Sequence, residues 1–165
     1  MKVNLQVSTE DDVPGLVTLR NRVAQHLTSR YGAGHWSLKT TDSGVLFSMR
    51  IGTVYVARSR NKLIATLTLS LRKPWAIDRS YFSNCKRPLY LTWMAVAPDL
   101  QRKGIGRLCI EQAIEIARRW PSEAIRLDAY DADAGGGEFY RKCGFREVGR
   151  ATYRNSPLIY FEMLV

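Results

Sequence analysis

The sequence has no long hydrophobic run and no secretion signal. Its longest apolar stretch, residues 89–97, is interrupted by Thr92 and is far shorter than the ~20 residues that a membrane-spanning helix requires. The N-terminal segment MKVNLQVSTEDD turns acidic at once and lacks the apolar core of a signal peptide. We therefore expect a cytoplasmic protein without a membrane partner.

Metal-ligand and disulfide patterns are also missing. Cys85, Cys109 and Cys143 are widely spaced and form no C-x-x-C pair, and His26 and His35 have no cysteine at ligand spacing. Zinc sites need such ligands only a few residues apart, so no metal is expected. An odd number of cysteines suits a reducing compartment, and each cysteine is interpreted as a small apolar core residue.

Positive charge is in excess, but it is not concentrated in runs. The 25 basic and 15 acidic residues give a formal net charge of +10. Such a field attracts nucleic acid, phosphorylated ligands or acidic surfaces alike. Residues 83–165 nevertheless contain ten acidic residues, and no RNP motif, helix-turn-helix or zinc pattern occurs. We therefore expect no nucleic-acid partner.

The length and the hydrophobic pattern predict one α/β domain over residues 1–165. A chain of this length with 45% hydrophobic residues has room for one core. Apolar spacing predicts the order β-α-(loop)-β-β-β-α-β-α-β-β. The predicted strands are 3–7, 54–57, 63–71, 89–96, 125–129, 145–148 and 158–164; the predicted helices are one that begins after Thr9 and ends at Gly32, 105–120 and 135–143.

Two features complete this prediction of the fold. The strand, helix and strand between residues 89 and 130 form a βαβ unit, so these two strands should be parallel within a mixed central sheet flanked by helices. Residues 32–52 and 72–88 show no regular periodicity and are interpreted as connecting segments.

A glycine-containing turn has the sharpest functional pattern. The segment QRKGIGR at residues 101–107 follows the buried strand and opens the next helix. Glycines let the backbone curl tightly, and the N–H groups of a first helical turn lack partners within the helix. With the helix dipole and the charges of Arg102, Lys103 and Arg107, this predicts a pyrophosphate site. A glycine-softened helix start with solvated basic side chains is the alternative, and the P-loop and dinucleotide motifs are absent.

Two motifs resemble those of the GNAT superfamily of N-acetyltransferases. QRKGIG at 101–106, after MAVAP at 94–98, resembles the Q/R-x-x-G-x-G/A signature. FYRKCGF at 139–145, after LDAYDADA at 127–134, resembles the last motif of the family. The resemblance covers about residues 89–147. It implies a GNAT-like acyl-CoA N-acyltransferase fold and an enzyme that uses acetyl-CoA as cosubstrate.

The resemblance also implies which residues bind acetyl-CoA. In this family the strand equivalent to 89–96 splays from the next one and pairs with the pantetheine arm, while the turn holds the pyrophosphate. Asp133 stands where many relatives have an asparagine, and it is either a contact or a cap of a helix that begins at Ala134. The glycines 135–137 suggest a close approach of backbone to cofactor. The implied binding residues are Met94, Ala95, Val96, Gln101, Arg102, Lys103, Gly104, Ile105, Gly106, Arg107 and Asp133.

Two catalytic residues follow from the same resemblance. The tyrosine that protonates the leaving thiolate matches Tyr140, whose phenol is protonated at neutral pH. Packing as a core aromatic is the alternative. A glutamate that acts as base in some relatives matches Asp128, which is one methylene shorter, and an ion pair with Arg126 is the alternative. Thr92 stands where other relatives have an acid, and a threonine cannot be the base.

The expected reaction is therefore direct attack of a primary amine on acetyl-CoA. A CoA-binding domain that has lost catalysis, serving as a sensor or partner module, is the alternative. The acceptor stays open among a protein N-terminus, a lysine, a polyamine, an amino sugar and a drug amine, and a homodimer stays open too. Residues 28–52 and 72–88 are expected to shape its pocket, with Trp75, Asp78, Tyr81 and Trp93 as candidate wall residues.

Overall fold

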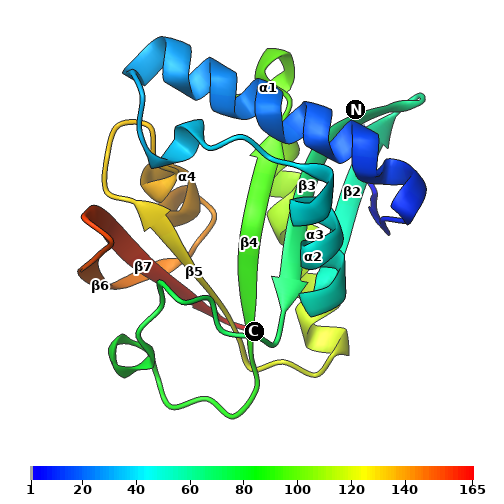
Figure 1. Ribbon diagram of the computed structural model, residues 1–165. Coiled ribbons are helices and arrows are strands. Elements are labelled where there is room, and N and C mark those ends of the chain that lie inside the picture. The colour runs from blue at the N-terminus through cyan, green and yellow to red at the C-terminus, as the bar shows by residue number, and fades with distance from the viewer. Residues whose placement is uncertain (1) are drawn as a thin grey trace.

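A mixed β-sheet forms the centre of the molecule (Figure 1). A computed structural model describes residues 2–165 of the chain. The seven strands lie in the order β1-β2-β3-β4-β5-β7-β6, which confirms the predicted mixed α/β fold. They are β1 (Leu5–Val7), β2 (Thr53–Ser59), β3 (Lys62–Ser70), β4 (Pro88–Val96), β5 (Ala124–Tyr130), β6 (Arg146–Tyr153) and β7 (Ser156–Leu164).

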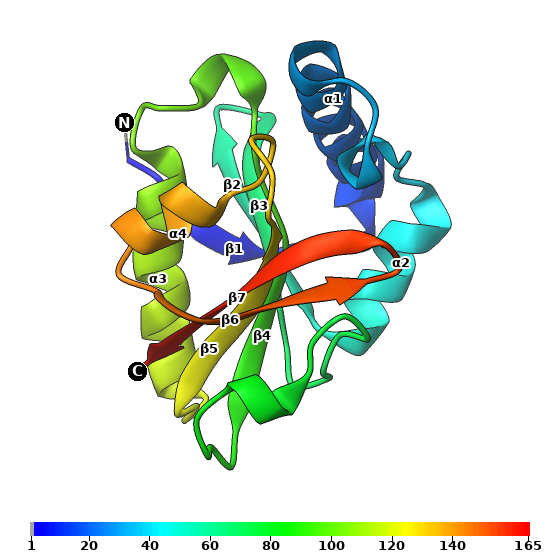
Figure 2. The ribbon, with the colours of Figure 1, turned by 90° about the vertical axis from the view of Figure 1, so that its left-hand side faces the viewer.

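Helices cover both faces of this sheet. Figure 2 shows α1 and α2 on one face and α3 and α4 on the other. The main core lies between the sheet and α3, whose residues Cys109, Ile110 and Ala113 are buried against it. Within residues 2–165, no helix is long and apolar enough to cross a membrane. The helices are α1 (Val13–Tyr31), α2 (Asp42–Ile51), α3 (Ile105–Arg119) and α4 (Gly137–Lys142).

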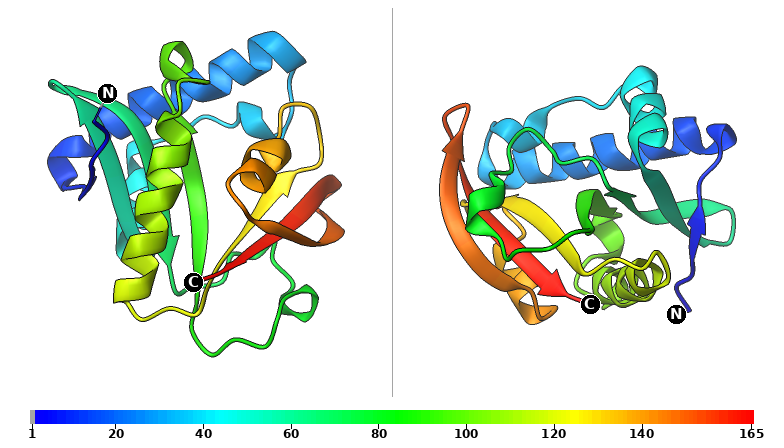
Figure 3. Two further views of the ribbon diagram at one scale, coloured as in Figure 1. Left: turned by 180° about the vertical axis from the view of Figure 1, so that it is seen from behind. Right: turned by 90° about the horizontal axis from the view of Figure 1, so that it is seen from below.

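The central strands β4 and β5 part from each other along their length. They pair in parallel at only three positions, Pro88↔Ala124, Leu89↔Ile125 and Tyr90↔Arg126, which confirms the predicted parallel pair. Beyond these positions β4 continues with β3 and β5 continues with β7, so the two strands diverge (Figure 3, left). The edge of β4 that faces β5 therefore has unpaired backbone groups available to a ligand.

A β-bulge in β4 lies at the opening between these strands. Thr68 pairs with Thr92 and Thr66 pairs with Ala95, so two residues of β4 oppose one residue of β3. One of the two, Trp93, has a left-handed φ of 54°. A bulge re-aims the side chains of its strand, and here Trp93 keeps 53% of its surface exposed. Trp93 is thus turned out of the core.

A buried ion pair fastens the connecting segment 72–88 to the sheet. Arg126 Nε donates to Glu162 Oε2 at 2.8 Å, and the two side chains are only 3% and 1% exposed. Arg126 also donates to the Ser83 carbonyl at 2.6 Å. The alternative in which Asp128 is the partner of Arg126 is therefore wrong, because Glu162 on β7 occupies that place.

The prediction that residues 32–52 are irregular is wrong, because they contain α2. Thr41 caps this helix by accepting from the Gly44 N–H at 3.2 Å. The buried face of α2 centres on Val45, which packs in a cluster with Leu16 of α1. A helix of only about three turns depends on tertiary packing for its stability. Its sequence pattern alone therefore predicts it weakly.

Three smaller expectations also need correction. Helix α4 begins at Gly137 with Gly136 as its N-cap, so Asp133 does not cap it. The strand expected at 145–148 extends to Tyr153, because it continues as a hairpin partner of β7. Cys109 is buried as expected, whereas Cys85 and Cys143 are only partly buried.

Candidate active site

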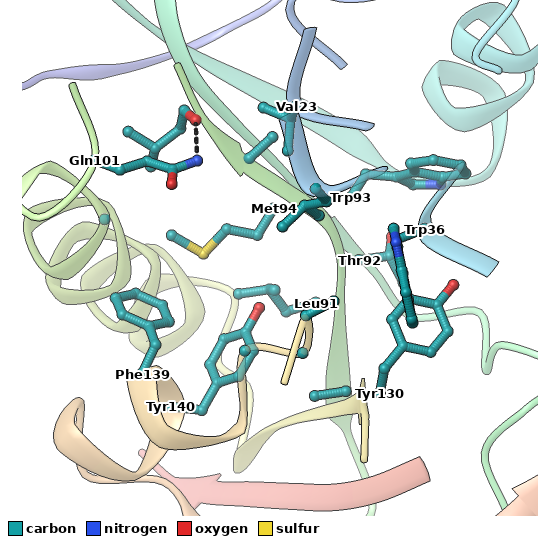
Figure 4. Close-up of a pocket in the computed structure, with 18 of the residues that line it drawn as sticks. Val23, Trp36, Leu91, Thr92, Trp93, Met94, Gln101, Tyr130, Phe139 and Tyr140 are labelled. Atoms are coloured by element: carbon teal, nitrogen blue, oxygen red, sulfur yellow. Dashed lines mark hydrogen bonds between the residues drawn. The ribbon is translucent and has the colours of Figure 1, made fainter. Parts of the chain in front are cut away.

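A cavity of about 870 Å³ lies where β4 and β5 part. Residues 91–96 of β4 and 128–130 of β5 line its two sides. Figure 4 shows Met94, Leu91 and Tyr140 in its middle part. We call one end of the cavity the turn end; it is lined by Gln101, Arg102, Gly104, Gly106 and Arg107. We call the other the α1 end; it is lined by Arg20, His35, Trp36, Trp93 and Tyr130.

At the turn end the backbone is open to the cavity at the glycines. Gly104 has a φ of +81°, and no atom lies within 4 Å of the place its Cβ would take. The Leu108 N–H donates to the Gly104 carbonyl at 3.1 Å, so the N–H groups just before it lie ahead of the first helical bond. Gln101 closes the turn by donating to the Val96 carbonyl at 3.1 Å. This cradle fits a pyrophosphate.

The basic residues of the turn have different surroundings. Arg102 and Arg107 line the cavity, and Arg107 also pairs with Glu111 at 3.1 Å. Lys103 does not line it and donates to the Asp99 carbonyl at 3.0 Å. Ile105 is 2% exposed and packs in the core, where it anchors the start of α3. Its side chain therefore supports the turn from behind.

Glycines at this end permit close packing of protein against protein. A Cβ on Gly106 would come within 3.1 Å of the Phe139 ring, so Gly106 lets α4 approach α3. A Cβ on Gly135 would come within 1.9 Å of the Tyr130 carbonyl oxygen. Gly135 therefore lets the chain approach the end of β5. Gly135 and Gly136 also line the cavity, so the close approach expected between the glycines 135–137 and the cofactor stays a prediction.

Tyr140 of α4 points its hydroxyl into the middle of the cavity, toward Leu91 (Figure 4). Its ring packs on Phe139, Phe145 and Phe161 at centroid distances of 5.1, 5.6 and 5.9 Å. Burial raises the pKa of the phenol far above its usual value, and the negative charge of Asp128 raises it further. The phenol is thus held by an aromatic cluster and stays protonated at neutral pH.

Asp128 lines the same cavity from β5. Burial raises the pKa of its carboxyl, since water is excluded from the charged form. The neighbouring phenol of Tyr130 has a pKa raised by burial first and by the Asp128 charge second. No ion pair to Asp128 occurs within residues 2–165. An unpaired carboxyl beside a proton donor can accept a proton from a ligand.

Segment 35–40 forms one wall of the cavity at its α1 end. Asn21 of α1 holds Thr40 through two hydrogen bonds, of 2.8 and 3.1 Å, to its backbone. At the other side, His35 stacks on Tyr130 at 6.2 Å and Trp36 meets Tyr130 edge-on at 5.8 Å. The segment therefore bridges α1 and β5 across the opening between the strands.

Not every residue expected in the site lies there. Lys103, Ile105 and the exposed Asp133 do not line the cavity, whereas the other expected binding residues and both expected catalytic residues do. Among the candidate wall residues, Trp93 lines it and Trp75, Asp78 and Tyr81 do not. The connecting segment 72–88 contributes nothing to the lining because it packs below β7, with Tyr81 on Tyr160.

The expectation that residues 28–52 shape the cavity holds for its part 35–40, but the sequence analysis did not single out Arg20, Trp36 and Tyr130 as cavity residues. For Arg20 a signal existed, because it interrupts the apolar stripe of α1 between Leu16 and Val23. A charged residue at a position that should face the sheet points to a special role. Trp36 and Tyr130 meet only through the fold, so their spacing along the chain contained no such signal.

Comparison with known proteins agrees with this geometry. The family model described as "Acetyltransferase (GNAT) family" matches residues 20–145, which is most of the chain. The chain belongs to the GNAT family. This GNAT protein is an acetyltransferase, as the resemblance of the two motifs implies. GNAT-fold proteins bind acetyl-CoA, and the backbone cradle and the free edge of β4 fit that cosubstrate.

Two curated relatives have named activities. The GNAT chain is 28% identical over 131 residues to S-(2-succino)cysteine N-acetyltransferase of Bacillus subtilis (strain 168), covering 78% of this chain and 68% of that protein. It is 31% identical over 87 residues to glucosamine 6-phosphate N-acetyltransferase of Schizosaccharomyces pombe, covering 53% and 70%.

Solved structures show the same fold. A crystal structure of PaiA N-acetyltransferase from Thermoplasma acidophilum in complex with coenzyme A superposes with a TM-score of 0.72 at 15% identity, covering 97% of this chain and 98% of that one. Within residues 2–165, no group of three or more His, Cys, Asp or Glu side chains is arranged to hold a metal ion.

Proposed function

We propose that this acetyltransferase moves the acetyl group of acetyl-CoA to the primary amine of a small acceptor by direct attack. The observation that carries the proposal is the placement of Asp128 and Tyr140 in one cavity, between the two strands that part. Bound acetyl-CoA supplies an activated thioester. The turn end holds its phosphates through free N–H groups and the charges of Arg102 and Arg107.

Asp128 and Tyr140 divide the proton transfers between them. Asp128 takes a proton from the acceptor ammonium, and its raised pKa brings it closer to neutral pH, where a general base works best. The free amine forms the new N–C bond while the C–S bond breaks. Tyr140 donates its proton to the departing sulfur. The nitrogen loses two protons overall. The one that Asp128 accepts leaves to solvent, and the other reprotonates Tyr140.

Direct attack is favoured over a covalent enzyme intermediate by the state of Cys143. This thiol lines the cavity, and burial raises its pKa above the usual value. A thiol with a raised pKa supplies little thiolate, which is the nucleophilic form. The cavity therefore favours a bound amine as the attacking group.

A thiol-release assay tests this function. Acetyl-CoA is mixed with a panel of primary amines, and free CoA thiol is recorded with a chromogenic disulfide. We expect turnover with at least one amine and the same turnover by Cys143→Ala. Acetyl-CoA binding without thiol release on any amine would instead support the CoA-binding module. Radiolabelled acetyl group retained on the protein without an acceptor would contradict direct attack.

A further inference from the structure

Arg20 is a buried cation without a partner at the α1 end of the cavity. It is 5% exposed, yet none of Nε, Nη1 and Nη2 has a hydrogen-bond partner in the protein. The other buried arginine, Arg126, donates to both Glu162 and the Ser83 carbonyl. Burying a guanidinium without compensation is costly, so a ligand that supplies the missing acceptors would be bound strongly there.

The guanidinium nitrogens of Arg20 are covered by their surroundings, so a ligand reaches them only when a neighbouring side chain moves. Its guanidinium carbon lies 4.7 Å from the centroid of the Trp93 ring, so the indole covers one face. Stacking on a face does not use the N–H groups, which lie in the guanidinium plane. Trp93 stands on the bulge of β4 with 53% of its surface exposed, so it is the side of this stack that can move aside.

The charges that line the cavity indicate what kind of anion fits. The other arginines and the lysine of the lining, Arg102, Arg107 and Lys142, come from the turn and α4, so Arg20 is the fixed cation contributed by α1. One guanidinium matches one carboxylate in a two-bonded pair. A phosphate dianion would leave a full negative charge among Trp36, Trp93 and the neighbouring apolar side chains.

We infer that the acceptor is a small amine that also bears a carboxylate, with the carboxylate bound by Arg20 and the amine directed to Asp128. The inference rests on the proposed function and names the substrate class of the same site. Apolar side chains of α1, among them Val23 and Leu27, line the space beside Arg20 and suit an apolar amino-acid side chain. A peptide N-terminus lacks the free carboxylate next to its amine and does not fit.

Matched acceptors test the inference. Thiol release is measured with phenylalanine, phenylalaninamide and phenethylamine, and with leucine and 3-methylbutylamine, on the wild type and on Arg20→Met. We expect kcat/KM to favour the carboxylate-bearing member of each pair by about 100-fold, the size of a buried charged contact. Arg20→Met should remove that preference, because it takes away a contact that only the carboxylate-bearing member of each pair can make. Arg30→Met, which removes an exposed charge from the same helix, should keep the wild-type preference.

A stability measurement separates binding from a structural role. Because Arg20 has no partner, Arg20→Met should melt at the same temperature as the wild type or higher. A large loss of melting temperature would overturn the view that Arg20 is reserved for a ligand. Product inhibition of the wild type tests the same contact without any variant: N-acetylphenylalanine should inhibit, and N-acetylphenethylamine should not.

The outcomes distinguish the two proposals. Equal or better turnover of amines without a carboxylate, or a preference for glucosamine 6-phosphate, would overturn the inference while leaving the acetyltransfer reaction intact. If no amine is acetylated, calorimetry with N-acetylphenylalanine still tests Arg20. Binding by the wild type that is lost in Arg20→Met supports the carboxylate site alone, and no binding to the wild type overturns it.

Discussion

At the scale of single residues, the surroundings of a side chain decide what it can do in this site. Tyr140 and Asp128 are common residue types, but burial raises the pKa of both. For the phenol this secures the protonated, donating form. For the carboxyl it brings the pKa closer to neutral pH, so the carboxylate accepts a proton more readily. The same exclusion of water makes the unpartnered Arg20 a strong binding group, and it lowers the pKa of its guanidinium to about 10.

Replacing Tyr140 by phenylalanine tests the proton donor. Tyr140→Phe keeps the ring that packs on Phe139, Phe145 and Phe161 and removes only the hydroxyl. We expect kcat to fall about 100-fold, the low end for loss of a general acid, because a CoA thiolate is a tolerable leaving group. Calorimetry should show acetyl-CoA affinity unchanged. Full kcat on the best amine would return Tyr140 to a packing role.

Replacing Asp128 by asparagine tests the base through its pH dependence. Below the pKa of the amine, Asp128→Asn should be slower than the wild type, because the ammonium has no acceptor for its proton. At high pH free amine is abundant and the two rates should converge. The readout is a pH–rate profile of kcat/KM, and parallel profiles at all pH values would remove Asp128 from proton transfer.

The same substitution should stabilise the fold at neutral pH. Burial raises the folded-state pKa of Asp128, so folding favours its protonated form. The penalty is absent below the unfolded pKa of about 3.9, grows as pH rises through the window up to the raised pKa, and persists above it. Thermal melts should show Asp128→Asn more stable at pH 7 and equal to the wild type near pH 3. Lower stability at pH 7 would contradict the raised pKa.

At the scale of elements, the site depends on where strands and helices begin, end and part. The turn before α3 is a cradle because Gly104 takes a left-handed conformation at the helix N-cap. The opening between β4 and β5 exists because their pairing stops after three positions. Segment 35–40 covers the other end because Asn21 holds it to α1. The turn, the opening and the covering segment therefore all lie where a helix, a strand or a strand pairing begins or ends.

Gly104→Val tests the cradle. A branched side chain strains the +81° φ and projects into the open space at the turn, so acetyl-CoA binding measured by calorimetry should be lost. Gly32→Val is a matched control, because Gly32 has a φ of +82°, is also free of atoms within 4 Å, and lies outside the cavity. Both variants should lose similar stability, but only Gly104→Val should lose binding. Equal affinities in the two folded variants would remove the turn from the site.

At the scale of the whole molecule, two groups of strands meet in a short parallel seam. In the group β1, β2, β3 and β4 each strand is antiparallel to its neighbour. The same holds in the group β5, β7 and β6. The two groups join through only three residue pairs. Arg126 and Glu162 lie beside this seam and tie it to Ser83 of the connecting segment. These side-chain contacts therefore reinforce the short seam.

Breaking this pair should destabilise the protein strongly. Glu162→Leu leaves Arg126 buried without its partner, which typically costs ~3–5 kcal/mol of unfolding free energy. Glu115→Leu, which breaks an exposed pair with Arg118, should change stability little. Denaturant unfolding measures both. A Glu162→Leu protein as stable as the wild type would show that the seam does not rely on this pair.

Much of the fold was predictable because its signals are local. The strand 89–96, the helix after it and the turn 101–107 are adjacent in the chain, and their apolar spacing and glycines act over one or two turns of backbone. The motif around Tyr140 lies on a short helix for the same reason. Helix α2 was missed because its apolar face is meaningful only when it packs against α1.

The sequence by itself determined the parts of this protein whose physics is local: the order of the strands and of α1, α3 and α4, the parallel pair, the glycine-containing turn and the two motifs of the family. Only the tertiary structure decided what shares the cavity. Arg20, Trp36 and Tyr130 come from α1, the segment before α2 and β5, and they meet because the strands part. The burial of Arg20 and its lack of a hydrogen-bond partner arise only when these elements come together, since both depend on groups distant in the chain. The α1 end of the cavity is therefore a tertiary feature.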